Sequence, residues 1–297
     1  MAKPIRRRPA VEADGHHRDT TYPELPEPLR VPVFDNHTHI EMVDGEGLSV
    51  AEQLRRATAV GVQGIVQVGN DVPTSEWSAE QAAAEARILA AVALHPTVAA
   101  RAVHAGTLDA DLERIFELSG QPRVRAIGET GLDWHECADG DRDLQRRSFL
   151  AHIEMAKLRG KAMQIHDRDA HADVVEALLR NGAPERTVFH CFSGDEDLAR
   201  ICAEHGWYLS FSGTVSVKNA ENVRRALRVA PRELILVETD APFLTPHPLR
   251  GRPNAPYLIP VTLRSMAAPR GDAVDALAAQ VVRPTAPVDG AWTCPAL

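Results

Sequence analysis

Imidazole and carboxylate side chains, which bind divalent metal ions, follow several short apolar runs of this sequence. They are His37, His39, Glu129, His166, His190 and Asp240. His37 and His39 are two residues apart, so in an extended segment both point to the same side and can bind one ion. These ligand types together suit zinc, manganese or magnesium. Four histidines and two carboxylates exceed what one ion needs if it also binds water, so we predict two ions, about 3.5–4 Å apart, bridged by Glu129.

Each of these residues also has an ordinary structural interpretation. A single His-x-His pair is a weak indication of metal, and His166 or His190 alone could be a core histidine. Glu129 could be a charge at a helix N-terminus, and Asp240 could open a turn. Turn chemistry does not explain six such residues at the ends of five separate runs, so the set as a whole predicts a metal site.

Eight short apolar runs, each followed by a stretch with helical spacing, would position these side chains. The runs are 31–35, 64–69, 88–94, 124–128, 162–165, 187–190, 207–211 and 234–238. Their lengths and aliphatic content are typical of strands buried on both faces. In a chain of 297 residues they predict an α/β fold, a single-domain (β/α)8 TIM barrel, whose strand C-termini face one mouth. A doubly wound open sheet is the alternative, but no GxGxxG or Walker A sequence follows any run.

We expect the barrel to span residues 31–281. Residues 1–30 mix charges and prolines without apolar periodicity, which predicts a flexible or extended N-terminal arm. Residues 282–297 form an atypical C-terminal tail, because the sequence from Val281 onward contains three prolines and shows no helical stripe. The last helix is therefore expected to cover the barrel poorly.

The composition excludes several classes of protein. A net charge of −8 argues against coating nucleic acid through a basic surface, although bound metal ions could still create a local phosphate site. No apolar run approaches the roughly 20 residues that span a bilayer, and the N-terminus does not resemble a secretory signal. Four cysteines without CxxC spacing predict a reduced, cytoplasmic setting. We expect no membrane partner and a monomer.

Seven segments resemble one known family, the TatD-type metal-dependent deoxyribonucleases of the amidohydrolase-like barrel superfamily. They are FDNHTHI, ALHP, AIGETGLDW, QIHDRDA, VFHCFSG, LILVETDAPFLTP and GRPNAPYLIP. The similarity runs in order from about residue 31 to 268. It implies that His37, His39 and Asp240 bind one metal, that His166 and His190 bind the other, and that Glu129 bridges them.

The family resemblance also implies hydrolysis of phosphodiester bonds in DNA, often from a 3′ end. The predicted partner is therefore DNA, as single strands or 3′ ends. A metal-activated water would attack phosphorus with Asp240 as general base. Glu129, the predicted bridge between the metals, is the second predicted catalytic residue. Two residues depart from the family pattern: Asn36 replaces a small hydroxyl residue, and Trp134 replaces a tyrosine.

Five further residues could assist. Asp133 and Glu238 are predicted to hold ligand imidazoles in one tautomer. Arg168 could bind a phosphate or pair with Asp167 or Asp169. His95 could donate to phosphate or cap a helix, and Trp134 could stack on a base or pack in the protein.

Two other functions remain as alternatives. The first is hydrolysis of another ester or amide, such as aminoacyl-tRNA, at the same site; the cyclic-amidase branch is disfavoured because Glu129 stands where its lysine would be. The second is a non-catalytic binding protein, which we would expect to have lost metal ligands.

Overall fold

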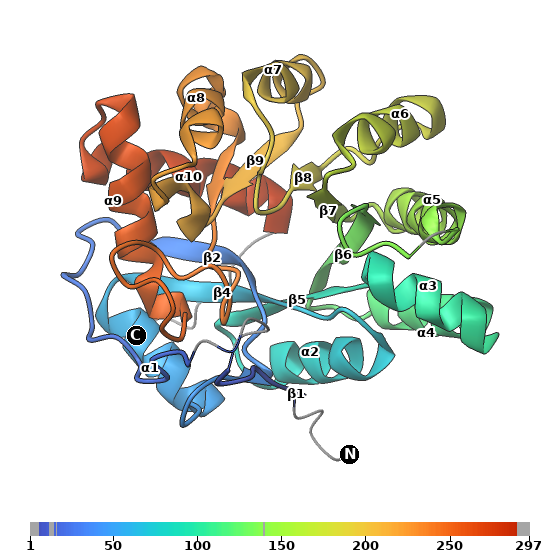
Figure 1. Ribbon diagram of the computed structural model, residues 1–297, viewed down its shortest axis with the longest axis horizontal. Helices are drawn as coiled ribbons and strands as arrows, with labels where there is room; N and C mark the ends of the chain where they lie inside the picture. The colour runs from blue at the N-terminus through green and yellow to red at the C-terminus, as the bar shows by residue number, and fades with distance from the viewer. Residues whose placement is uncertain (1–5, 12–14, 16, 139, 290–297) are drawn as a thin grey trace.

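Eight parallel strands form the centre of the molecule in the computed structural model, which describes residues 6–11, 15, 17–138 and 140–289 (Figure 1). The strands are β2 (Val33–Thr38), β4 (Val62–Val68), β5 (Ile88–Val92), β6 (Val124–Asp133), β7 (Ala162–Arg168), β8 (Thr187–Phe189), β9 (Tyr208–Phe211) and β10 (Ile235–Val237). Each pairs with the next along the chain. This arrangement confirms the predicted single-domain (β/α)8 barrel.

The barrel closes between its first and last strands at the mouth. The Asp240 amide donates to the His37 carbonyl at 2.9 Å, and the His39 amide donates to the Ala241 carbonyl at 2.7 Å. Thr38 and Ala241 form an isolated parallel bridge there. These bonds involve the backbone of three predicted metal ligands. Closure of the barrel therefore also fixes the backbone positions from which those side chains extend.

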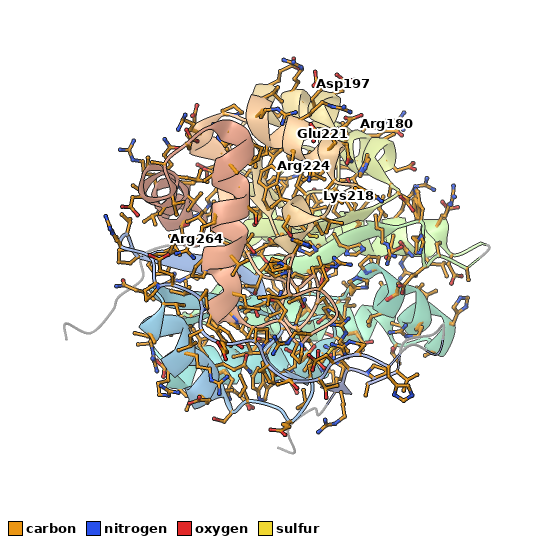
Figure 2. All side chains as sticks on the ribbon, turned by 60° about the vertical axis from the view of Figure 1, so that its left-hand side comes forward. Arg180, Asp197, Lys218, Glu221, Arg224 and Arg264 are labelled. Atoms are coloured by element: carbon orange, nitrogen blue, oxygen red, sulfur yellow. The ribbon has the colours of Figure 1, made fainter. Side chains whose placement is uncertain are left out.

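Helices surround the strands (Figure 1). They are α1 (Val50–Ala59), α2 (Val72–Ala84), α3 (Pro96–Ala105), α4 (Leu108–Ser119), α5 (Arg142–Arg159), α6 (His171–Asn181), α7 (Glu196–Glu204), α8 (Glu221–Val229), α9 (Ile259–Arg270) and α10 (Val274–Asp289), with short 3-10 turns η1 (Gly213–Ser216), η2 (Arg232–Leu234) and η3 (Pro256–Leu258). Their outer faces are charged, as Arg180, Asp197 and Glu221 illustrate (Figure 2). No helix among the described residues combines the length and hydropathy needed to cross a bilayer.

Alternation along the strands divides the apolar core into two clusters. Ile65, Ile88 and Val92 belong to the larger cluster, which packs the strands against the helices. The smaller cluster consists of Val66, Val68, Leu89, Ala91, Ala126, Ala162, Val188, Leu236 and Val288. Since neighbouring strand residues point to opposite faces, the strand members of the smaller cluster fill the barrel interior.

The expectation that the sequence from Val281 onward has no helical stripe is wrong for residues 281–289, because α10 continues to Asp289. Leu277, Val281 and Val288 are buried at helical spacing, and α10 packs against β10 and β2 behind the barrel (Figure 1). Fully burying an aliphatic side chain contributes about 1.5–3 kcal/mol. Together these contacts offset the roughly 3 kcal/mol cost of a proline such as Pro284 inside a helix. Residues 290–297 of the predicted tail lie outside the described residues.

The described part of the N-terminal arm is extended and lies on the mouth side of the barrel. Its strand β1 (Arg6–Arg7) pairs in parallel with β3 (Met42–Val43), which follows β2. Arg18 donates to both carboxylate oxygens of Asp44, at 3.1 and 2.7 Å, and both side chains are buried. The arm is therefore attached to the loop that follows the first predicted metal ligands.

Candidate metal centre

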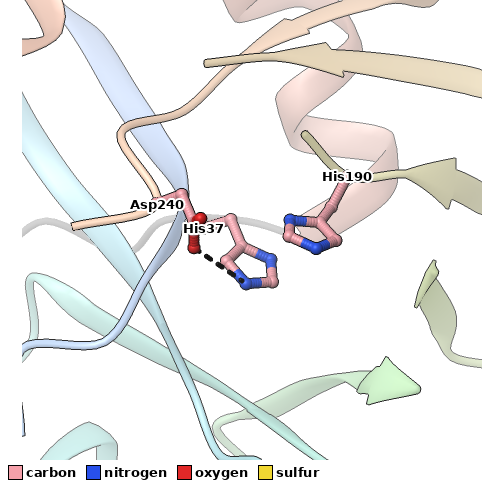
Figure 3. A group of neighbouring side chains, drawn as sticks. All are labelled: His37, His190 and Asp240. Atoms are coloured by element: carbon pink, nitrogen blue, oxygen red, sulfur yellow. Dashed lines mark ion pairs between the residues drawn. The ribbon is translucent and has the colours of Figure 1, made fainter. Parts of the chain in front are cut away.

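All six predicted metal ligands converge at the mouth of the barrel. His37 lies on β2, Glu129 on β6 and His166 on β7. The others follow strand ends: His39 after β2, His190 after β8 and Asp240 after β10. The His37 and His190 rings stack with centroids 3.9 Å apart, and Asp240 faces His37 (Figure 3). Residues separated by some 200 positions in sequence thus share one pocket because every parallel strand ends at the same rim.

Glu129 lies between two pairs of histidines. Its Oε2 atom is 3.8 Å from Nε2 of His37 and 3.5 Å from Nε2 of His39. Its Oε1 atom is 2.6 Å from Nδ1 of His166 and 2.9 Å from Nε2 of His190. A carboxylate with one oxygen toward each pair has the geometry of a bridging ligand.

The spacing around the first pair suits a shared cation. Nε2 of His37 and Nε2 of His39 are 3.2 Å apart, and Oδ1 of Asp240 is 3.9 and 3.5 Å from them. Ligands about 2.0–2.1 Å from one tetrahedral ion lie roughly 3.4 Å from each other. The donor atoms of His37, His39 and Glu129 lie within 4.8 Å of one another, as do those of Glu129, His166 and His190. The residues present therefore fit divalent ions.

Two carboxylates outside this set orient the second pair of histidines. Oδ2 of Asp133 is 2.9 Å from Nε2 of His166, and Oε1 of Glu238 is 3.3 Å from Nδ1 of His190. The same Glu238 oxygen accepts the Cys191 amide at 2.7 Å, which holds the carboxylate in place. Asp133 and Glu238 thus contact the imidazoles that the sequence predicts they orient.

Burial and the neighbouring charged groups shift the pKa values of the carboxylates and imidazoles in the site. Burial would raise the pKa of Glu129, but the facing histidines, His190 foremost, lower it well below its ordinary value. Burial opposes protonation of His166, yet the Asp133 and Glu129 carboxylates raise its pKa to about 9. Burial, reinforced by nearby His190, lowers the pKa of His37 to about 4. His37 is therefore neutral at pH 7, the form in which imidazole binds metal.

His95 caps a helix, which is one of its two predicted alternatives, and its other ring nitrogen lies near the metal site. It is the N-cap of α3, where its Nδ1 atom lies 2.9 Å from Oγ1 of Thr97. Its Nε2 atom lies 3.7 Å from Oε1 of Glu129, and its ring meets the His166 ring edge-on, with centroids 4.5 Å apart. Capping one helix turn thus holds the other ring nitrogen toward the metal site.

Arg168 and Trp134 differ in their position. Arg168 lines the cavity over the site and pairs with Glu136 at 3.1 Å, and not with the neighbouring aspartates named as its alternative partners. Trp134 does not line the cavity. Its indole N–H donates to Asp173 of α6 at 2.8 Å, and the guanidinium groups of Arg142 and Arg146 lie 5.0 and 5.2 Å from its ring. The packing alternative describes Trp134, and the predicted stacking on a base is not supported.

The cavity over the site has a volume of about 630 Å³, and its lining includes residues that the sequence analysis missed, among them Asn70 and Arg6. Asn70 follows β4 and donates to Oε2 of Glu129 at 3.4 Å. Its place directly after an apolar run, like that of the predicted ligands, is a signal that could have identified it. Arg6 comes from the arm, and no local pattern connects it to the strand ends.

Comparison with known proteins agrees with the family resemblance. Residues 34–286 match the family described as "TatD related DNase". A Mycobacterium tuberculosis protein named "Uncharacterized metal-dependent hydrolase TatD" is 44% identical over 240 residues, which cover 79% of this chain and 89% of that protein. A Klebsiella pneumoniae protein named "3'-5' ssDNA/RNA exonuclease TatD" is 32% identical over 238 residues, which cover 77% and 87%. The structure of YJJV, a TatD homologue from Escherichia coli, matches with a TM-score of 0.77 at 23% identity and covers 86% of this chain and 97% of that one.

Proposed function

The chain belongs to the TatD-related DNase family and is a metal-dependent hydrolase, and we propose that it removes nucleotides from the 3′ ends of single-stranded DNA. The observation that carries this proposal is Glu129, whose two oxygens face two separate histidine pairs. Two adjoining metal sites suit phosphodiester hydrolysis, because one ion can stabilise the attacking oxygen and the other the leaving oxygen. The naming of the Klebsiella relative supports the choice of single-stranded nucleic acid.

The six residues divide into two sets in this proposal. His37, His39 and Asp240 would hold one ion, His166 and His190 would hold the other, and Glu129 would contact both. Divalent ions in these positions would supply a Lewis acid for the phosphate oxygens and would lower the pKa of bound water to about 7.

Asp240 is proposed to accept the proton of the attacking water. Its backbone is held on both sides, since its amide donates to His37 and its carbonyl accepts the Phe243 amide at 2.9 Å. Its side chain is 13% exposed and lines the cavity. The carboxylate therefore reaches the substrate side of the site from a constrained position, as a general base must.

Positive side chains around the cavity would bind the substrate. Arg101 and Arg168 line it, in a chain whose net charge is −8. Since the overall charge is negative, binding to phosphate has to depend on such local groups and on the ions.

The test is degradation of a 5′-labelled single-stranded DNA oligonucleotide by the protein loaded with Mg²⁺ or Mn²⁺, with a 3′-blocked oligonucleotide and an aminoacyl-tRNA in parallel. We expect stepwise shortening from the free 3′ end that stops in excess EDTA and resumes when the metal is restored. Shortening that persists in EDTA, or turnover of aminoacyl-tRNA alone, would overturn the proposal.

A further inference from the structure

The N-terminal arm brings a guanidinium group into the cavity. Arg6 lies on β1, whose pairing with Met42 and Val43 places it just past the strand that carries His37. Its side chain is 33% exposed and lines the same cavity as Glu129 and Asp240. The arm precedes residues 34–286, which match the family, so Arg6 is an addition to the part of the site that those residues build.

Arg6 is connected to the metal site through one side chain. Its Nη2 atom donates to Oδ1 of Asn70 at 3.0 Å, and Nδ2 of Asn70 donates to Oε2 of Glu129 at 3.4 Å. The same Nη2 atom donates to Glu41 at 3.1 Å, and that carboxylate is fully buried. These contacts place the guanidinium next to Asn70, which itself contacts the carboxylate proposed to bridge the ions.

Within the part of the chain that the structure describes, the hydrogen bonds of the Arg6 guanidinium all come from its Nη2 atom. Its Nε atom is buried and has no hydrogen-bond partner among the described residues. Because that atom is buried, a ligand in the cavity would contact the exposed part of the Arg6 side chain. The planar arrangement of guanidinium donors matches the oxygens of a phosphate.

The neighbouring Arg7 provides an internal comparison. Its Nη1 atom donates to the Gly45 carbonyl at 2.7 Å, and its side chain lines a separate groove with Pro9 and Thr20. Successive residues of an extended strand point to opposite sides, so only Arg6 of this pair faces the cavity.

We propose that Arg6 binds a non-scissile phosphate of the nucleic-acid strand while the metal site holds the scissile one. This inference rests on the proposed function, because it requires a substrate with more than one phosphate. Arg6 is then a substrate-binding residue that acts on affinity and leaves the chemical step unchanged.

The experiment compares Arg6→Gln with Arg7→Gln, which removes the same charge from the same strand, in the metal-loaded full chain. Two substrates are used: a single-stranded oligonucleotide, and bis(p-nitrophenyl) phosphate, which has one phosphodiester and no neighbouring phosphate. Affinity is also measured without turnover, from the fluorescence anisotropy of a labelled phosphorothioate oligonucleotide. Thermal unfolding of each variant reports on folding, and Arg6→Lys restores the charge.

We expect Arg6→Gln to raise KM for the oligonucleotide and the Kd of the phosphorothioate about tenfold, the effect of losing one charge-assisted hydrogen bond. Its kcat, and its KM for bis(p-nitrophenyl) phosphate, should stay within about twofold of wild type. Arg7→Gln should resemble wild type, and Arg6→Lys should recover part of the affinity.

Three results would overturn the inference, and they are distinguishable. If wild type degrades the oligonucleotide and Arg6→Gln matches it, Arg6 does not bind the strand, although the proposed function stands. If Arg6→Gln and Arg7→Gln weaken binding equally, the arm acts only through its overall charge. If wild type does not degrade oligonucleotides, the proposed function fails and the inference fails with it.

Discussion

The two ends of the barrel are built from the same strands but have opposite chemistry. At the mouth, buried histidines and carboxylates such as His37, Glu129 and Asp240 face one another. Toward the other end, the interior holds small apolar side chains such as Ala126 and Ala162, together with Val288 from α10. Polar side chains buried at the mouth need partners, whereas apolar contacts on the opposite side stabilise the fold without any ligand. Function and stability are thus divided along the barrel axis, and substitutions at the two ends should have separable effects.

The largest effect is expected at Glu129. Glu129→Gln keeps the shape of the side chain but removes the charge shared by both histidine pairs, so we expect loss of bound metal and a fall in kcat of roughly 10³-fold or more. Metal content by mass spectrometry and the oligonucleotide assay check this, with circular dichroism to verify folding. Two retained ions with near-normal turnover would show that Glu129 is not the bridge.

A somewhat smaller effect is expected at Asp240, which we propose as a ligand of one ion and as the acceptor of the water proton. Asp240→Asn should lower kcat by roughly 10²- to 10⁴-fold while much of the metal remains bound. The comparison with Glu129→Gln separates ligand from base, because only the Glu129 variant should lose most of its metal. Turnover of Asp240→Asn near the wild-type rate would contradict the role of Asp240 as general base.

At the opposite end of the barrel, Val288→Ala should lower stability and leave chemistry intact. The valine is 1% exposed within the inner cluster, and truncating a buried aliphatic side chain costs about 1–3 kcal/mol. Denaturant unfolding measures the loss, with Val282→Ala as a matched control, because Val282 is only partly buried on the same helix. A large drop in kcat for Val288→Ala would mean that the two ends are not independent.

The smallest effect is expected at Trp134, which lies near the mouth but is turned away from it. Trp134→Phe removes the hydrogen bond to Asp173, so stability should fall by about 1 kcal/mol. Because the ring does not line the cavity, KM for the oligonucleotide should remain within about twofold. An increase in KM with unchanged stability would restore the stacking interpretation.

Most of the fold and the six central residues could be predicted because their signals are local. Apolar runs such as 88–94 and the polar residue that follows each run are read directly along the chain. The failures involve contacts between distant segments. The helical spacing of Leu277, Val281 and Val288 was present in the sequence, but the prolines among these residues suggested an irregular tail. Only packing against β2 and β10 shows that burial outweighs the cost of those prolines.

The amino-acid sequence by itself determined which ligand chemistry is present and that it lies at strand ends, since residue type and apolar periodicity are properties of short segments. Tertiary structure decided how that chemistry is arranged. It placed one oxygen of Glu129 toward each histidine pair, turned Trp134 toward α6, and brought Arg6 of the arm beside Asn70. Each of these outcomes depends on contacts between residues far apart in the chain, and such contacts exist only once the barrel has closed.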